Sequence, residues 1–88
     1  MDYRVQLSAE AIQTLAGLDK LVAVRITRRL EWLAHNFYSI KPEPLKGGFS
    51  DFYKYRIGDY RVLYFVSRND RVIFIRSLGH RRDVYKQK

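Results

Sequence analysis

Apolar and polar residues alternate with two different periods along this 88-residue chain. Residues 3–7 alternate as a short half-buried strand does, and Ser8 follows as a candidate helix N-cap. From about residue 20 to about residue 37, apolar side chains recur every three or four positions, at Val22, Ile26, Leu30, Leu33 and Phe37. Gly17 can end a first helix in the left-handed conformation, and Asp19 can cap the second. The first half therefore predicts two helices packed as an antiparallel hairpin.

The second half changes to the period of strands, at residues 52–57, 60–67 and 72–78. Gly58-Asp59 is a pair that two-residue hairpin turns favour, and Asn69-Asp70 indicates a second tight turn. Pro and Gly residues interrupt the connection at 38–51, where Leu45-Lys46 is expected as a short edge strand. We expect an α+β fold, with the helix hairpin on one face of a small antiparallel β-sheet in the order β-α-α-β-β-β(-β). Residues 1–88 are expected to form a single domain.

Two-residue turns would fix the register of the sheet, with Arg56 opposite Arg61 and Leu63 opposite Arg76. One face of the sheet would then be apolar and lie under the helices. The other face would carry cations among apolar side chains, namely Lys54, Arg56, Arg61 and Arg76 with Leu63, Phe65, Phe74 and Leu78. Like charges directly opposite each other destabilise a sheet, whereas an anion bound between them would offset that cost. The alternative is that these long side chains spread into solvent.

The formal net charge is +8 and is uneven along the chain. Residues 1–40 carry five Lys/Arg and four Asp/Glu (+1), whereas residues 41–88 carry twelve and five (+7). Such a balance favours a polyanionic partner, usually nucleic acid, over a basic surface without a partner. The chain has no cysteine, no signal-peptide pattern and no stretch apolar enough to span a membrane, so a cytoplasmic location is expected.

The candidate chemistry gathers in the run Gly79-His80-Arg81-Arg82-Asp83-Val84-Tyr85, directly after the last predicted strand. Two histidines, no cysteine and scattered acids predict neither a metal site nor a cofactor. Metal-free cleavage of RNA fits these residues, because RNA carries its own nucleophile in the 2′-OH group. An enzyme must only orient that group, stabilise charge on phosphorus and move two protons. Arginine side chains stay ionised and bind phosphate oxygens in pairs, so they can stabilise the charge that develops on the phosphate. Tyr85 and His80 are candidates to exchange protons.

Together with Lys54-Tyr55-Arg56 and the run from Asp59 to Tyr64, this motif resembles the RelE-type toxins of the RelE/ParE superfamily. The resemblance covers essentially the whole chain. It implies a RelE-like fold and the toxin of a type II toxin–antitoxin system. The implied activity is that of a ribosome-dependent mRNA interferase, an endoribonuclease that cuts mRNA in the A site of the 30S subunit by 2′-OH attack and leaves a 2′,3′-cyclic phosphate.

The resemblance also implies roles for individual residues. Arg61 matches the arginine that stabilises the transition state, and Arg81 matches a general acid or charge stabiliser. Tyr85 matches a proposed general base, and Lys54 matches a lysine of the sheet; these four are the catalytic candidates. The RNA-binding candidates are the remaining basic residues of this region, Lys46, Arg56, Arg76, His80 and Arg82. At Arg56 the family often has lysine.

The resemblance further implies a cognate antitoxin that wraps and neutralises the toxin, in a complex that is expected to bind operator DNA. Leu63, Phe65, Phe74 and Leu78 are candidate apolar anchors for it. Two alternatives remain open: a DNA gyrase inhibitor of the ParE branch without RNase activity, and a non-catalytic nucleic-acid-binding module. The motif arginines and Tyr85 favour RNA cleavage.

Overall fold

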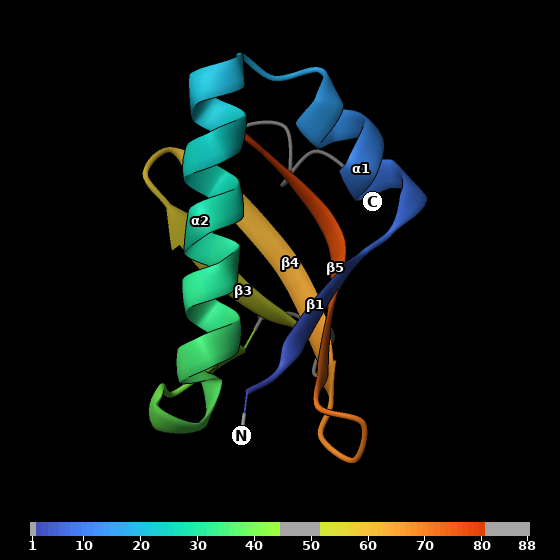
Figure 1. Ribbon diagram of the computed structural model, residues 1–88, viewed down its shortest axis with the longest axis vertical. Helices are drawn as coiled ribbons and strands as arrows, with labels where there is room; N and C mark the ends of the chain where they lie inside the picture. The colour runs from blue at the N-terminus through green and yellow to red at the C-terminus, as the bar shows by residue number, and fades with distance from the viewer. Residues whose placement is uncertain (1, 45–51, 81–88) are drawn as a thin grey trace.

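The computed structural model describes residues 2–44 and 52–80 of the chain. Its elements are β1 (Arg4–Leu7), α1 (Ala9–Ala16), α2 (Lys20–Asn36), the 3₁₀ turn η1 (Phe37–Ser39), β2 (Glu43–Pro44), β3 (Tyr53–Ile57), β4 (Tyr60–Ser67) and β5 (Val72–His80). Both helices lie on the same side of the sheet (Figure 1). The predicted α+β fold, with a helix hairpin on one face of a sheet, is confirmed.

The two predicted N-caps are present. The Ala11 N–H donates to Ser8 Oγ at 3.0 Å, and the Leu21 N–H donates to Asp19 Oδ2 at 3.1 Å. The expectation for Gly17 was wrong: its φ of −86° is right-handed. The Gly17 N–H still donates to the carbonyl oxygen of Gln13 at 3.1 Å, so the chain leaves α1 without the left-handed residue.

The sheet has five strands in the order β1-β5-β4-β3-β2. The pairs β2–β3, β3–β4 and β4–β5 are antiparallel, whereas β1 runs parallel to β5. The sheet is therefore mostly antiparallel, with β1 and β2 at its two edges and both helices between these strands in the chain. The short edge strand occurs at Glu43–Pro44; Leu45 and Lys46, where it was expected, lie outside the described residues.

The hairpin of β3 and β4 has the predicted register. Gly58 adopts a φ of +60° in the turn, as positive-φ turns require. Arg56 lies opposite Arg61, and Lys54 lies opposite Leu63.

The predicted register between β4 and β5 holds only for part of their length. Phe65 lies opposite Phe74 as expected, but a β-bulge follows: Tyr64 pairs with Ile75 and Leu63 pairs with Ser77. Arg76 is the extra residue and has no partner in β4, so the expected pairing of Leu63 with Arg76 was wrong. An extra residue turns the following side chains to the other face. Leu78 therefore lies in the core at 4% exposure instead of on the outer face.

The core lies between the helices and the sheet. It contains apolar residues of α2 and of the three central strands, including Ile26, Leu30, Leu33, Val62, Ile73 and Ile75. The ring of Phe37 lies 4.9 Å from that of Tyr3 and 6.2 Å from that of Tyr64, centroid to centroid. Burial, and then the nearby Tyr53 and Tyr55, raise the pKa of the Tyr64 phenol above its ordinary value, so Tyr64 is neutral.

Candidate functional site

The face of the sheet turned away from the helices holds the predicted site. Alternation along β3, β4 and β5, together with the observed register, places six side chains on this side. We call it the open face and define it by Lys54, Arg56, Arg61, Leu63, Phe65 and Phe74. Three predicted site residues, Lys54, Arg56 and Arg61, thus lie on neighbouring positions of β3 and β4.

Arg61 is the most unusual residue of the open face. Its exposure is only 8%, and its Nη1 atom is buried without a hydrogen-bond partner in the described part of the chain. Arg56, directly opposite, is exposed and carries the same charge. A buried donor left unpaired costs about 1–3 kcal/mol, and more when it is charged. Arg61 is therefore held where an anion would satisfy it.

Within residues 2–44 and 52–80 there are three ion pairs, His35–Asp2, Lys54–Glu43 and Arg76–Glu10. Neither Arg56 nor Arg61 takes part in one of them. The two arginines are therefore cross-strand neighbours on β3 and β4, and no carboxylate of these pairs neutralises either of them. Guanidinium groups bind phosphate oxygens in pairs, so this arrangement fits a phosphate.

Lys54 extends the positive charge along β3. Its Nζ atom lies 3.3 Å from Glu43 Oε2 on β2, with the lysine side chain 25% exposed and the glutamate side chain 68% exposed. Ion pairs at such exposure contribute little to stability, so Glu43 positions the ammonium group without neutralising it permanently. The sequence offered no signal for Glu43, which falls in the predicted loop.

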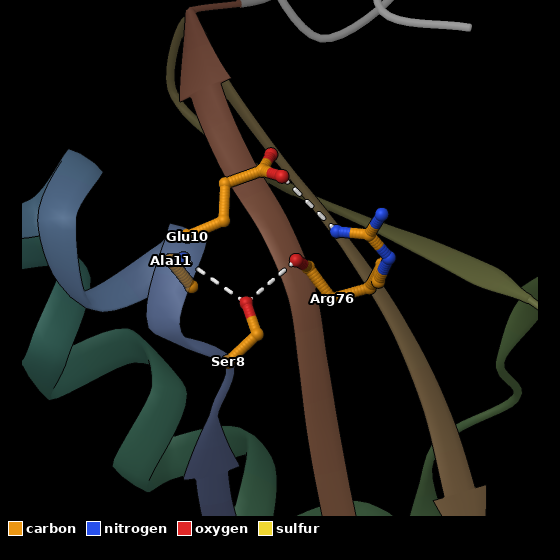
Figure 2. A network of polar contacts seen from close by, with 4 residues as sticks. All are labelled: Ser8, Glu10, Ala11 and Arg76. Atoms are coloured by element: carbon orange, nitrogen blue, oxygen red, sulfur yellow. Dashed lines mark hydrogen bonds and ion pairs between the residues drawn. The ribbon is translucent and has the colours of Figure 1, made fainter.

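Two predicted RNA-binding residues lie elsewhere. The guanidinium of Arg76 reaches α1, where Nη1 donates to Glu10 Oε1 at 3.1 Å (Figure 2). His80 pairs with Tyr60 in the sheet, and their ring centroids are 5.8 Å apart. Tyr60 packs against the core, so His80 lies on the side of the helices. The structure does not bring either residue to the open face.

Four further candidates, Arg81, Arg82, Tyr85 and Lys46, lie outside the described residues, and their roles stay predictions.

The open face also carries aromatic side chains. The rings of Phe65 and Phe74 stack with their centroids 5.0 Å apart and an interplanar angle of 15°. Phe52, which the sequence did not single out, places its ring against that of Phe65 at 5.7 Å. Phe65 remains 38% exposed, so the phenyl row, which we define as Phe65 and Phe74, is accessible to an apolar partner group.

Other kinds of site find little support in the described ranges. Residues 2–44 and 52–80 contain no group of three or more His, Cys, Asp or Glu side chains that could hold a metal ion. Neither helix in this part of the chain has the length and apolar character needed to cross a bilayer.

Comparison with solved structures gives strong matches. The chain is 32% identical to a chain of the archaeal RelE–RelB complex from Pyrococcus horikoshii, covering 92% of this chain and 97% of that one with a TM-score of 0.70. The toxin–antitoxin complex RelBE2 from Mycobacterium tuberculosis matches with a TM-score of 0.80 at 20% identity, over 91% and 99% of the two chains. Free E. coli RelE with two arginines replaced by alanine matches with a TM-score of 0.77 at 24% identity, over 99% and 94%.

Sequence comparison gives the family. A search of curated proteins found no match. Residues 5–85 match the family described as the ParE toxin of the type II toxin–antitoxin system parDE. The match spans almost the whole chain, both helices and the sheet included. The chain therefore belongs to the ParE toxin family, in the RelE/ParE superfamily of type II toxins.

Proposed function

We propose that this toxin is a ribosome-dependent, metal-independent endoribonuclease that cleaves mRNA in the A site. The observation that carries the proposal is Arg61, a buried arginine with an unpaired Nη1 atom, which lies directly opposite Arg56 in the sheet. A protein keeps such a costly arrangement where an anion, here the scissile phosphate, occupies it during function.

The proposed reaction is an internal transfer. The 2′-oxygen attacks the adjacent phosphorus, and the bond from phosphorus to the 5′-oxygen of the next nucleotide breaks. One proton leaves the 2′-OH group, and one is delivered to the departing 5′-oxygen. The products are a 2′,3′-cyclic phosphate and a 5′-hydroxyl group. The negative charge that develops on the phosphoryl oxygens is where fixed guanidiniums act most strongly.

In this proposal Arg61 binds a phosphoryl oxygen in the transition state, and Arg56 holds the same phosphate from the solvent side. Lys54 contributes a further positive charge from β3. By resemblance, Arg81 acts as general acid or charge stabiliser and Tyr85 as general base. Arginine at position 56 does not serve as a base, because its guanidinium stays protonated.

A cognate antitoxin is the proposed regulatory partner. Structures similar to this chain are described as RelBE and RelE–RelB complexes, from M. tuberculosis, P. horikoshii, E. coli and Methanococcus jannaschii. We propose that the antitoxin buries the phenyl row of Phe65 and Phe74 and that the complex binds operator DNA. The proposed place of action is the cytoplasm, where translating ribosomes are found.

A second candidate is inhibition of DNA gyrase, because the matched family is named for ParE. Primer extension on mRNA from cells that express the toxin separates the two. Discrete new 5′ ends within translated codons support RNA cleavage. An SOS response with intact mRNA would support the gyrase inhibitor and overturn our proposal.

A further inference from the structure

The bulge in β5 determines what lies beside Arg61. Beyond it, Gly79 pairs with Arg61 and Leu78 pairs with Val62. If the pairing of Tyr64 with Ile75 simply continued, Leu78 would stand opposite Arg61 and Ser77 opposite Val62. The bulge therefore places a residue without a side chain opposite Arg61 and moves Leu78 into the core, where it is 4% exposed.

The bulge also removes a cation from the open face. Without it, Arg76 would lie opposite Leu63, as the alternation of the sequence predicts. With it, the Arg76 guanidinium is bound to Glu10 on α1. The surroundings of Arg61 thus depend on one extra residue in β5.

The turn between β1 and α1 holds this extra residue in place (Figure 2). The Ser8 hydroxyl donates to the carbonyl oxygen of Arg76 at 2.8 Å, while Ser8 Oγ accepts the Ala11 N–H at 3.0 Å. The Ser8 N–H donates to the carbonyl oxygen of Ile75 at 3.0 Å. An unpaired bulge carbonyl needs a donor, and Ser8 supplies it while it caps the helix.

We propose that Ser8 is a positioning residue for the candidate catalytic site: it fixes the β5 bulge, which keeps Gly79 instead of Leu78 beside Arg61. The inference rests on the proposed RNA cleavage for its effect on catalysis. Its structural part, the dependence of the register on Ser8, stands independently of the activity.

Three substitutions separate this role from helix capping. Ser8→Asp keeps a good cap acceptor but has no hydroxyl proton to donate to the Arg76 carbonyl oxygen, and Ser8→Gly lacks the donor at only a small cost to the cap. Ser8→Thr retains both hydrogen bonds and is the matched control. If Ser8 acted only as a helix cap, Ser8→Asp and Ser8→Thr would both behave as the parent protein.

Two readouts are needed. The first is the set of cross-strand nuclear Overhauser contacts between backbone protons of Arg61 and Gly79 in isotope-labelled protein. The second is cleavage of mRNA on programmed ribosomes, with kcat and KM measured separately. We expect Ser8→Asp and Ser8→Gly to lose the Arg61–Gly79 contacts. Their kcat should fall about tenfold or more with little change in KM, because misplacement by about 1 Å can cost about a hundredfold. Ser8→Thr should behave as the parent.

The outcomes are distinguishable. Retention of the Arg61–Gly79 contacts in both Ser8→Asp and Ser8→Gly would overturn the structural part. Lost contacts with unchanged kcat would overturn the positioning role. If the unsubstituted toxin cleaves no RNA, the proposed function fails, and the Overhauser contacts still decide whether Ser8 sets the register. If Ser8→Asp does not fold, Ser8→Gly carries the comparison.

Discussion

Arg61 should weaken the fold and support the activity at the same time. The substitution Arg61→Met removes the charge and its unpaired Nη1 atom while it keeps an apolar side chain of suitable length. The unpaired buried donor costs about 1–3 kcal/mol, and the opposing Arg56 adds roughly 0.2–1 kcal/mol. We expect Arg61→Met to raise the free energy of unfolding by about 1–3 kcal/mol, which corresponds to roughly 4–8 °C in Tm for each 1 kcal/mol.

The same substitution should abolish growth arrest. Loss of one preorganised donor to a transition-state oxyanion typically lowers kcat by about 10²–10³. Arg61→Lys should retain part of the activity, because it keeps the charge without the paired donors. Urea denaturation measures the stability, and single-turnover cleavage on programmed ribosomes measures the rate.

The control for Arg61→Met is Arg28→Met, which replaces an exposed arginine on α2, on the far side of the sheet from the open face. It should change neither the unfolding free energy nor the cleavage rate appreciably. The reasoning would be refuted if Arg61→Met were less stable than the parent and still cleaved RNA at the parental rate.

Further substitutions test the surrounding structure. Arg56→Ala should raise stability by up to ~1 kcal/mol and reduce the salt dependence of RNA binding, as filter binding at several salt concentrations can show; an unchanged salt slope would argue against a phosphate contact. Gly58→Ala should destabilise the protein by about 1 kcal/mol or more in urea melts, because φ at Gly58 is +60°, a conformation strained for alanine, and the new Cβ atom would also displace the Arg25 side chain, whose Nη2 atom would lie 2.6 Å away. Because burial raises the pKa of Tyr64 in the fold, its contribution to stability should be constant below about pH 10 and be lost progressively above it. Tyr64→Phe should make the free energy of unfolding fall less steeply above this pH, as urea melts at several pH values can show. An equal slope in the parent and the variant would contradict this role of Tyr64. Tyr85→Phe should slow cleavage most at high pH, where a phenolate base is populated, and an unchanged pH–rate profile would exclude it as the essential base.

Local patterns predicted the parts of this fold that local chemistry controls. Ser8 and Asp19 correctly predicted where the helices begin. The Gly58-Asp59 turn correctly predicted the register that places Arg56 opposite Arg61. The bulge was not predictable in this way. It depends on a hydrogen bond between Ser8 and Arg76, which are 68 positions apart, and alternation along one strand carries no information about such a contact. The burial of Arg61 likewise depends on what packs around it.

The pairing of β1 with β5 also determines when the open face can form during synthesis. Residues 4–7 leave the ribosome first but have their partners at residues 72–75. A growing chain therefore lacks both the neighbour of β1 and the backbone opposite Arg61 until β5 has been synthesised. The open face, which includes Phe74, is therefore complete only after residues 72–80 have been synthesised and have paired with β4.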